Sequence, residues 1–350
     1  MTFNFCTLFN SNYLSRGLGL YQSLKTYCSD FNLYVFAFDA KSYDILKALN
    51  YSNLIPISLK DFEDSELIKI KPTRSAAEYC WTCTPSTILY AIKNFKLDHC
   101  TYVDADMMFF SDPKVLIDEM DNRSVLITEH RYTKDYDQAI KSGKYCVQFV
   151  TVKNDVKGMA IVEWWRNACI DWCYARHEDG KFGDQKYLDD WTTRFDGVHE
   201  LQHLGGGIAP WNVQQYNFTK NDNVFSGKQI STGKTFNVVF FHFHALKYYT
   251  NGMVSLSDEG YEIKKEVIEY FYKPYIRLLE TVKKEINKID DSFDPNGANS
   301  HAPYDELGFS MIKKIYLEGV KSSKKNIFGI KVIKRIKHHY FYRVSKFINA

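Results

Sequence analysis

The sequence is poor in the features that mark disordered, secreted or membrane-spanning chains. Only 8 of its 350 residues are proline and 45% are hydrophobic, so disorder is not expected over most of the chain. Nowhere does an apolar run approach the roughly 18 residues that a membrane-spanning helix needs. The start, MTFNFCTLFNSNYLSRG, has no basic region followed by an apolar one. We therefore expect no signal peptide and a cytoplasmic protein.

The eight cysteines fit that compartment, because most lie in apolar or helical stretches where a free thiol behaves as a small hydrophobe. The pairs Cys80/Cys83 and Cys169/Cys173 have spacings that also occur in zinc sites. Both pairs lie in aromatic, helix-like runs without the tight turns of a zinc knuckle. We therefore favour buried, reduced thiols over zinc.

Net positive charge is confined to the end of the sequence, because residues 1–310 are slightly acidic. Residues 311–350 hold 11 Lys and Arg and one acidic residue, whereas residues 1–310 hold 34 and 41. The basic residues alternate with Ile, Val, Phe and Tyr at nearly helical spacing. This pattern is typical of an amphipathic helix on an anionic membrane surface. A solvated basic helix is one alternative, and nucleic-acid binding is a third that we do not expect.

Strand-like runs alternate with helix-like patterns over the first hundred residues. This alternation is typical of βαβ units, so we predict an α/β fold with a mostly parallel central sheet flanked by helices. The expected strands are residues 3–10, 31–39, 53–59 and the run before Asp104, and the expected helices are residues 13–28, 41–50 and 75–95.

The pattern is less regular after Pro113, and no internal repeat is visible. We predict strands over residues 124–130, 145–152 and 234–246, helices over 158–177 and about 258–289, and loops over 203–212 and 290–306. We expect a main domain over residues 1–255, a helical extension and loop over 256–310, and the basic amphipathic tail over 311–350.

Two carboxylates follow a strand that is otherwise strongly apolar, in HCTYVDADMMFFSDP. A bend at the small Ala105 allows Asp104 and Asp106 to turn toward one point and chelate Mg²⁺ or Mn²⁺. Asp39 also closes a strand, so it shares the edge of the sheet at which ligands bind in such folds. The alternative is an ordinary acidic turn, but charges within an apolar segment need a partner.

Five segments, in a fixed order, carry a resemblance to a known family. They are FNFCTLFNSNYLSRGLGLYQSL, YVDADMMFFSDP, FGDQKYLDDW, HLGGGIAPWN and VVFFHFHALK. They resemble the GT-A glycosyltransferases, particularly the bacterial and glycogenin-type enzymes of glycosyltransferase family 8. The resemblance covers roughly residues 1–250. It implies a GT-A catalytic domain, a UDP-sugar as donor substrate, and Mn²⁺ or Mg²⁺ as cofactor.

The resemblance implies that Asp104, Asp106 and His242 hold the metal. In the family a glycine usually stands three residues after the first histidine of this segment, whereas here Ala245 does. Because strand alternation places His242 and His244 on one face, His244 is the second choice as ligand.

Further residues are expected around the donor. By resemblance Asp184 and Gln185 lie near the donor sugar, a role that we favour over the alternative in which Asp184 caps the helix that follows it. Trp211 and Asn212 are expected to shape the acceptor side or to close over the donor. The other expected donor contacts are Thr7, Phe9, Asn10, Asp39, Arg74, Ala105 and Lys247, the last at the diphosphate.

These features predict a metal-dependent hexosyltransferase-like enzyme that acts in bacterial surface polysaccharide, lipopolysaccharide or capsule synthesis. Its acceptor would be a glycan or lipid-linked glycan, and the resemblance implies retention of anomeric configuration. An inverting reaction would need a general base, for which Asp184, Asp189 and Asp190 are candidates. A sugar nucleotidyltransferase is less favoured, because NSNYLSRGLGL lacks a glycine-rich phosphate cradle. A non-catalytic glycan-binding protein on the same fold is the third alternative.

Overall fold

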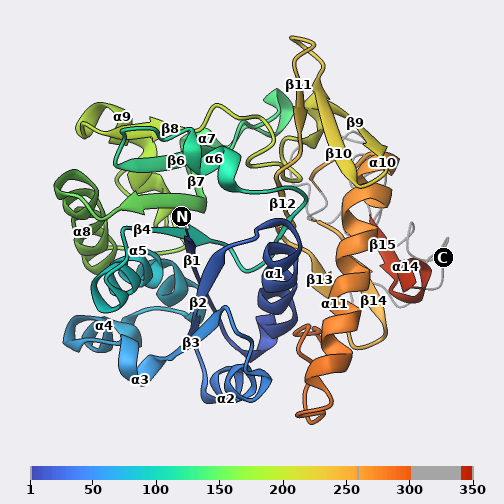
Figure 1. Cartoon of the computed structure of the whole chain (residues 1–350), viewed down its shortest axis with the longest axis horizontal. Coiled ribbons are helices and arrows are strands. Elements are labelled where there is room, and N and C mark those ends of the chain that lie inside the picture. Colours follow the sequence, from blue (N-terminus) through green and yellow to red (C-terminus); the bar gives the residue numbers. More distant parts are fainter. Residues whose placement is uncertain (1, 258–259, 301–339, 349–350) are drawn as a thin grey trace, which may run out of the picture.

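The computed structural model describes residues 2–257, 260–300 and 340–348. A seven-stranded sheet with the order β3-β2-β1-β4-β7-β6-β8 forms its centre (Figure 1). Only β7 runs against its neighbours, because β4 and β6 both pair with it antiparallel. The strands are β1 (Phe3–Phe9), β2 (Phe31–Ala37), β3 (Leu54–Ser58), β4 (His99–Val103), β6 (Val125–Glu129), β7 (Tyr145–Lys153) and β8 (Val198–Glu200). The predicted α/β class with a mostly parallel sheet is confirmed.

Helices cover both faces of this sheet because its buried strands are apolar on both sides. Along β1, Phe3, Phe5 and Phe9 join one core cluster, whereas Cys6 and Leu8 join the other. The first face is covered by α1 (Leu14–Tyr27), α2 (Ala40–Leu49) and α11 (Lys273–Ile286). The second is covered by α3 (Leu59–Phe62), α4 (Ser65–Ile70), α5 (Ala76–Phe95) and α8 (Val156–Asp171). The shorter helices are α6 (Lys114–Asp118), α7 (Ala139–Ser142), α9 (Trp191–Arg194), α10 (Lys265–Val267) and α14 (Ser345–Ile348).

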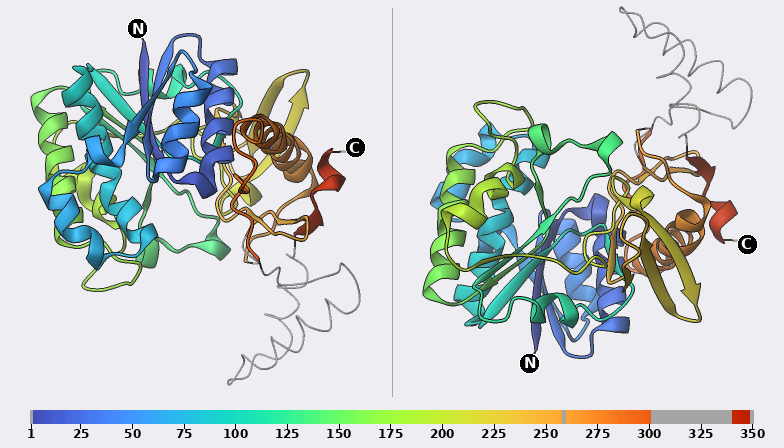
Figure 2. Two further views of the ribbon diagram at one scale, coloured as in Figure 1. Left: turned by 90° about the horizontal axis from the view of Figure 1, so that it is seen from below. Right: turned by 90° about the horizontal axis from the view of Figure 1, so that it is seen from above.

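Three small sheets extend the structure beyond the central one. The first pairs β5 (Met107–Phe109) with β12 (Phe240–His242), and the second contains β9 (Tyr216–Asn221), β10 (Val224–Gln229) and β11 (Thr235–Asn237). The third contains β13 (Lys247–Tyr248), β14 (Met253–Ser255) and β15 (Phe341–Arg343). Figure 2 shows β15 and α14 beside α11, on the side of the molecule away from α8. The expected basic tail lies mostly outside the described residues, and the three-part domain division stays a prediction.

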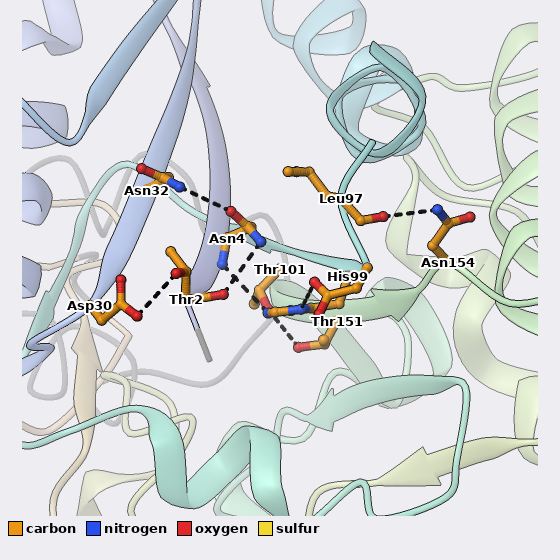
Figure 3. Close-up of polar contacts among 10 residues, drawn as sticks. Thr2, Asn4, Asp30, Asn32, Leu97, His99, Thr101, Thr151 and Asn154 are labelled. Carbon is orange, nitrogen blue, oxygen red and sulfur yellow. Dashed lines mark hydrogen bonds and ion pairs between the residues drawn. The ribbon is translucent and has the colours of Figure 1, made fainter. Parts of the chain in front are cut away.

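Polar side chains join β1, β2 and β4 near their N-terminal ends, together with the C-terminal part of β7 (Figure 3). The Asn4 backbone N–H reaches His99 Nε2 at 3.5 Å, and the Asn32 amide donates to Asn4 Oδ1 at 3.3 Å. The hydroxyls of Thr101 and Thr151 are 2.9 Å apart across β4 and β7. These contacts fix the strand register at the edge opposite the carboxyl ends of β1 and β4.

Three sequence expectations are corrected by the structure. The helix expected over 158–177 ends at Asp171, because the chain beyond it bonds elsewhere: the Ala175 N–H donates to Glu78 and the Gly183 N–H to the Tyr174 carbonyl. The strand expected over 234–246 is split, because β11 pairs with β10 while β12 pairs with β5. The helix expected from about residue 258 begins only at Lys265 and passes through a π-turn at Ile268–Tyr272.

Seven of the eight cysteines are buried, as expected, and Cys80 is half-buried. Within the described part of the chain, no helix is both long enough and apolar enough to cross a bilayer.

Candidate active site

A tight turn at the carboxyl end of β4 holds the two aspartates. The Asp104 N–H donates to the Gln148 carbonyl of β7 at 3.2 Å, and the Met107 N–H donates to the Asp104 carbonyl at 3.3 Å. Ala105 is 7% exposed and belongs to the core, so its small side chain lets both carboxylates stay on the open side. Asp104 and Asp106 are partly buried.

His242 reaches this turn because β12 pairs with the strand that directly follows it. In the register of this pair His242 lies opposite Met107, and the Phe243 N–H donates to the Asp106 carbonyl at 2.9 Å. His242 Nε2 is 3.1 Å from Asp106 Oδ1 and 3.7 Å from Asp104 Oδ2. Its Nδ1 donates to Gln148 Oε1 at 2.8 Å.

The charges of this cluster are strongly coupled. Burial raises the pKa of Asp104 to about 6, although His242 opposes the shift. Burial also acts to raise the pKa of Asp106, but the charge and the hydrogen bond of His242 prevail and lower that pKa to about 2. The two aspartates in turn raise the pKa of His242 above its ordinary value, against the effect of its burial.

These residues fit a divalent cation. Because Nδ1 donates to Gln148, a neutral His242 directs its Nε2 lone pair toward two carboxylates. Such an arrangement needs either a second proton on the ring or a cation between the groups. Carboxylate oxygens and an imidazole nitrogen are ligands that Mn²⁺ and Mg²⁺ sites use. His244, the second choice, lies close by, with its ring centroid 5.8 Å from that of His242.

A cavity of about 550 Å³ opens from this cluster. Seven of the predicted residues line it: Asp104, Asp106, Asp184, Gln185, Trp211, His242 and His244. The Phe, Tyr and Trp residues of its lining are Tyr13, Trp81, Tyr102, Tyr132, Phe182, Trp211 and Tyr261. Aromatic faces with a few polar groups suit the binding of a sugar.

Asp184 is an unusual carboxyl in this lining. It is 3% exposed, and its Oδ2 has no hydrogen-bond partner. Burial raises the pKa of Asp184 to about 7. It precedes the 3₁₀ helix Gln185–Asp190 without capping it through its side chain, so the capping alternative is not observed. The neighbouring Gln185 amide donates to the Ser142 carbonyl at 2.7 Å.

The predicted nucleotide contacts on β1 and β2 are not among the residues that line the cavity. Thr7 and Phe9 are buried, and Thr7 Oγ1 has no hydrogen-bond partner. Asn10 caps the short turn Ser11–Tyr13, which carries Tyr13 into the cavity wall. Asp39 accepts from the Ser11 N–H at 2.9 Å and from the start of α2; despite its burial, these bonds lower the pKa of Asp39.

The predicted cations are also placed away from the lining. Arg74 donates to the Ile170 carbonyl at 3.1 Å and lies over the Tyr174 ring at 4.0 Å. Lys247 is exposed on β13. The site roles of these two residues and of the β1 and β2 residues stay predictions.

The glycine-rich segment, residues 203–212, forms a loop, and buried hydrogen bonds hold its Pro-Trp-Asn end in place. Asn212 is fully buried, and its amide donates to the carbonyls of His130 and Gly207 at 2.9 and 2.8 Å. Trp211 Nε1 donates to the same His130 carbonyl at 2.9 Å. The Trp211 ring is 5.4 Å from that of His242, so the loop presents Trp211, and not Asn212, to the cavity.

The sequence reading missed two residues of β7, Cys146 and Gln148. Cys146 lines the cavity, and Gln148 holds both Asp104 and His242. The strand itself was predicted, and its alternation puts both side chains on one face. The missing information was its direction, because only an antiparallel β7 brings its first residues to the end of β4.

The chain was compared with protein families, with known protein sequences and with solved structures. No family model matches it. It is 29% identical over 310 residues to uncharacterized protein YfnD of Bacillus subtilis, with 86% of this chain and 95% of the relative covered. It is 26% identical over 305 residues to uncharacterized protein YfnF of the same organism, with 84% and 97% covered.

Among solved structures, it is similar to the galactosyltransferase LgtC in complex with donor and acceptor sugar analogues. The TM-score is 0.48 at 11% identity, and 79% of this chain and 95% of LgtC are covered. It is also similar to mouse xyloside xylosyltransferase 1, with a TM-score of 0.39 at 12% identity and 60% and 87% covered. Both are glycosyltransferases, the class that the sequence motifs resemble.

Proposed function

We propose that the protein is a metal-dependent glycosyltransferase that moves a sugar from a nucleotide-sugar donor, UDP-linked, to a glycan acceptor. The observation that carries this proposal is the convergence of Asp104, Asp106 and His242 Nε2 at one end of a sugar-sized cavity. Paired carboxylates and an imidazole suit a cation that also binds a diphosphate. The aromatic and polar remainder of the cavity suits the sugar.

The described residues have separate tasks in such a reaction. A divalent cation at the aspartates would supply neutralisation of the charge that develops on the leaving diphosphate. Gln148 fixes the His242 ring so that Nε2 faces the aspartates. Asp184 has an unpartnered carboxyl oxygen and lies in the same cavity, where an ionised carboxylate stabilises a sugar carbon that becomes positively charged.

A donor screen tests this proposal. Each nucleotide sugar is incubated with the protein and Mn²⁺, and release of the nucleoside diphosphate is measured. We expect release with one donor, and a loss of at least about 100-fold in Asp106→Asn, because a group that stabilises charge in the transition state is weakened. Asp112→Asn, on the exposed turn after β5, is the matched control and should retain the activity.

Two results of this screen would overturn the proposal. One is the absence of release with every donor in the presence of glycan acceptors, as expected for a glycan-binding protein. The other is release of pyrophosphate from a nucleoside triphosphate and a sugar phosphate, as expected for a nucleotidyltransferase.

We further propose that the acceptor belongs to a bacterial surface glycan, lipopolysaccharide or capsule, and that the sugar keeps its anomeric configuration. The support is the sequence resemblance. The proton NMR coupling of the anomeric position in the product distinguishes retention from inversion.

The basic sequence of residues 311–350 supports attachment to the inner face of a membrane in the cytoplasm, where a lipid-linked acceptor would lie. Co-sedimentation with anionic vesicles tests this. Unchanged binding after removal of residues 303–337 would contradict it.

A further inference from the structure

Strand β7 places a thiol beside the expected metal ligands. Cys146 is the second residue of β7 and is 4% exposed. One ligand atom from each of Asp104, Cys146 and His242 lies within 4.8 Å of the other two. Among the described residues, no other three His, Cys, Asp or Glu side chains meet this 4.8 Å limit. Asp106 does not belong to this set.

These separations suit one bound ion. Bonds of about 2.0–2.3 Å from a metal to oxygen, nitrogen and sulfur place two ligand atoms about 3–4.5 Å apart. The three residues also line the same cavity, so a fourth coordination position would open into it. Three protein ligands and one open position are the arrangement of a zinc site that binds a substrate or water.

We propose that Cys146 binds the metal of this site as a thiolate, together with Asp104 and His242. The site then selects a cation that accepts sulfur, such as Zn²⁺ or Co²⁺, over Mg²⁺. On binding, the S–H bond breaks, the sulfur forms a bond to the metal, and the proton leaves to solvent. Asp106, whose Oδ1 lies 3.1 Å from His242 Nε2, remains an oxygen ligand of the same ion, as in the proposed function.

This inference rests on the metal site of the proposed function, but it is independent of sugar transfer. The competing possibility is a buried thiol that only packs against His242. Metal binding without any sugar nucleotide therefore separates the two, and it leaves the transferase proposal untouched if it fails.

The test is titration of the full chain with Co²⁺, followed by absorption spectroscopy. Thiolate ligation gives a sulfur-to-cobalt charge-transfer band in the near ultraviolet, which oxygen and nitrogen ligands do not give. We expect the band in the wild type and in Cys28→Ser, a matched buried thiol whose Sγ bonds the Asp30 carbonyl away from the cavity. We expect its loss in Cys146→Ser.

A competition titration with a zinc chelator gives a second readout. Cys146→Ser should lower Zn²⁺ affinity at least about 10–100-fold, the range seen even for residues that only support a ligand. Mg²⁺ affinity should change little. If the wild type binds Co²⁺ stoichiometrically without the band, the proposal is wrong whether or not the variant folds. A band that persists in Cys146→Ser would also overturn it.

Discussion

Ala245 has a left-handed backbone, with φ of 63°, three residues after His242. An alanine in this region is strained by its Cβ, and glycine is not. We therefore expect Ala245→Gly to raise the free energy of unfolding by about 0.5–1 kcal/mol. Urea unfolding measures this. Ala209→Gly, at a buried position without positive φ, should be less stable than the wild type, and the reverse order would contradict the argument.

Asp184 gives the free energy of unfolding a specific dependence on pH. Its pKa is about 7 when folded and 3.8 in a model compound, so between these values the folded state holds a proton that the unfolded state has lost. Stability from this group is therefore complete below about pH 4 and falls as pH rises to about 7. Asp184→Asn removes this loss and should be more stable than the wild type at pH 8, by up to roughly 4 kcal/mol.

Urea unfolding at pH 4 and pH 8, with a metal chelator present, checks this expectation. The exposed Asp190→Asn serves as the control. Equal stability differences at the two pH values would show that folding does not raise the pKa of Asp184. The same substitution should lower sugar transfer if the proposed function is right.

At the scale of residues, the sequence predicts those features that depend only on neighbouring residues. Asp104, Ala105 and Asp106 stand together, so their turn and their position at the strand end could be inferred. Arg74 shows the limit, because its partner carbonyl at Ile170 depends on how α5 and α8 pack, which no local pattern records.

At the scale of elements, the Pro-Trp-Asn end of the glycine-rich loop is held by one amide. Asn212 also accepts from the Ala209 N–H at 3.0 Å, so Asn212→Ala leaves several buried backbone groups unpaired. We expect a loss of about 1–3 kcal/mol and a change in Trp211 fluorescence. Asn217→Ala, on the exposed side of β9, should do neither. A stable Asn212→Ala variant with unchanged fluorescence would show that the loop is held by other contacts.

The regular elements were predicted well wherever apolar periodicity and strand ends agree, as for β1, β2 and α5. The prediction failed where one run of residues changes partners. Residues 234–246 are mostly apolar, yet they cross from the β9–β10–β11 sheet to β5 between Asn237 and Phe240. The change is made by long-range pairing, and the run marks it only with Asn237, without glycine or proline.

At the scale of the whole molecule, the C-terminal end is part of the folded body. Phe341 and Phe347 are 1% and 3% exposed, and Arg277 donates to the Phe347 carbonyl at 2.6 Å. Removal of residues 311–350 should therefore lower the melting temperature, because it exposes this buried surface.

An internal deletion avoids that loss. Asn299 bridges to Tyr249, the residue after β13, and β15 pairs with β14, so the described residues on both sides of 301–339 contact one small sheet or the residue next to it. Replacement of residues 303–337 by a short Gly-Ser linker should keep the melting temperature near that of the wild type. Equal destabilisation by both deletions would contradict this, and thermal unfolding followed by circular dichroism distinguishes them.

The pairing of β12 with β5 also has a kinetic consequence. Asp104 and His242 meet only when strands far apart in the chain have joined, and contacts of this kind form late during folding. A metal that binds the finished cluster stabilises the native state more than the folding transition state. It should therefore slow unfolding and leave the folding rate nearly unchanged, so the lifetime of the folded protein would rise with occupancy of the proposed metal site.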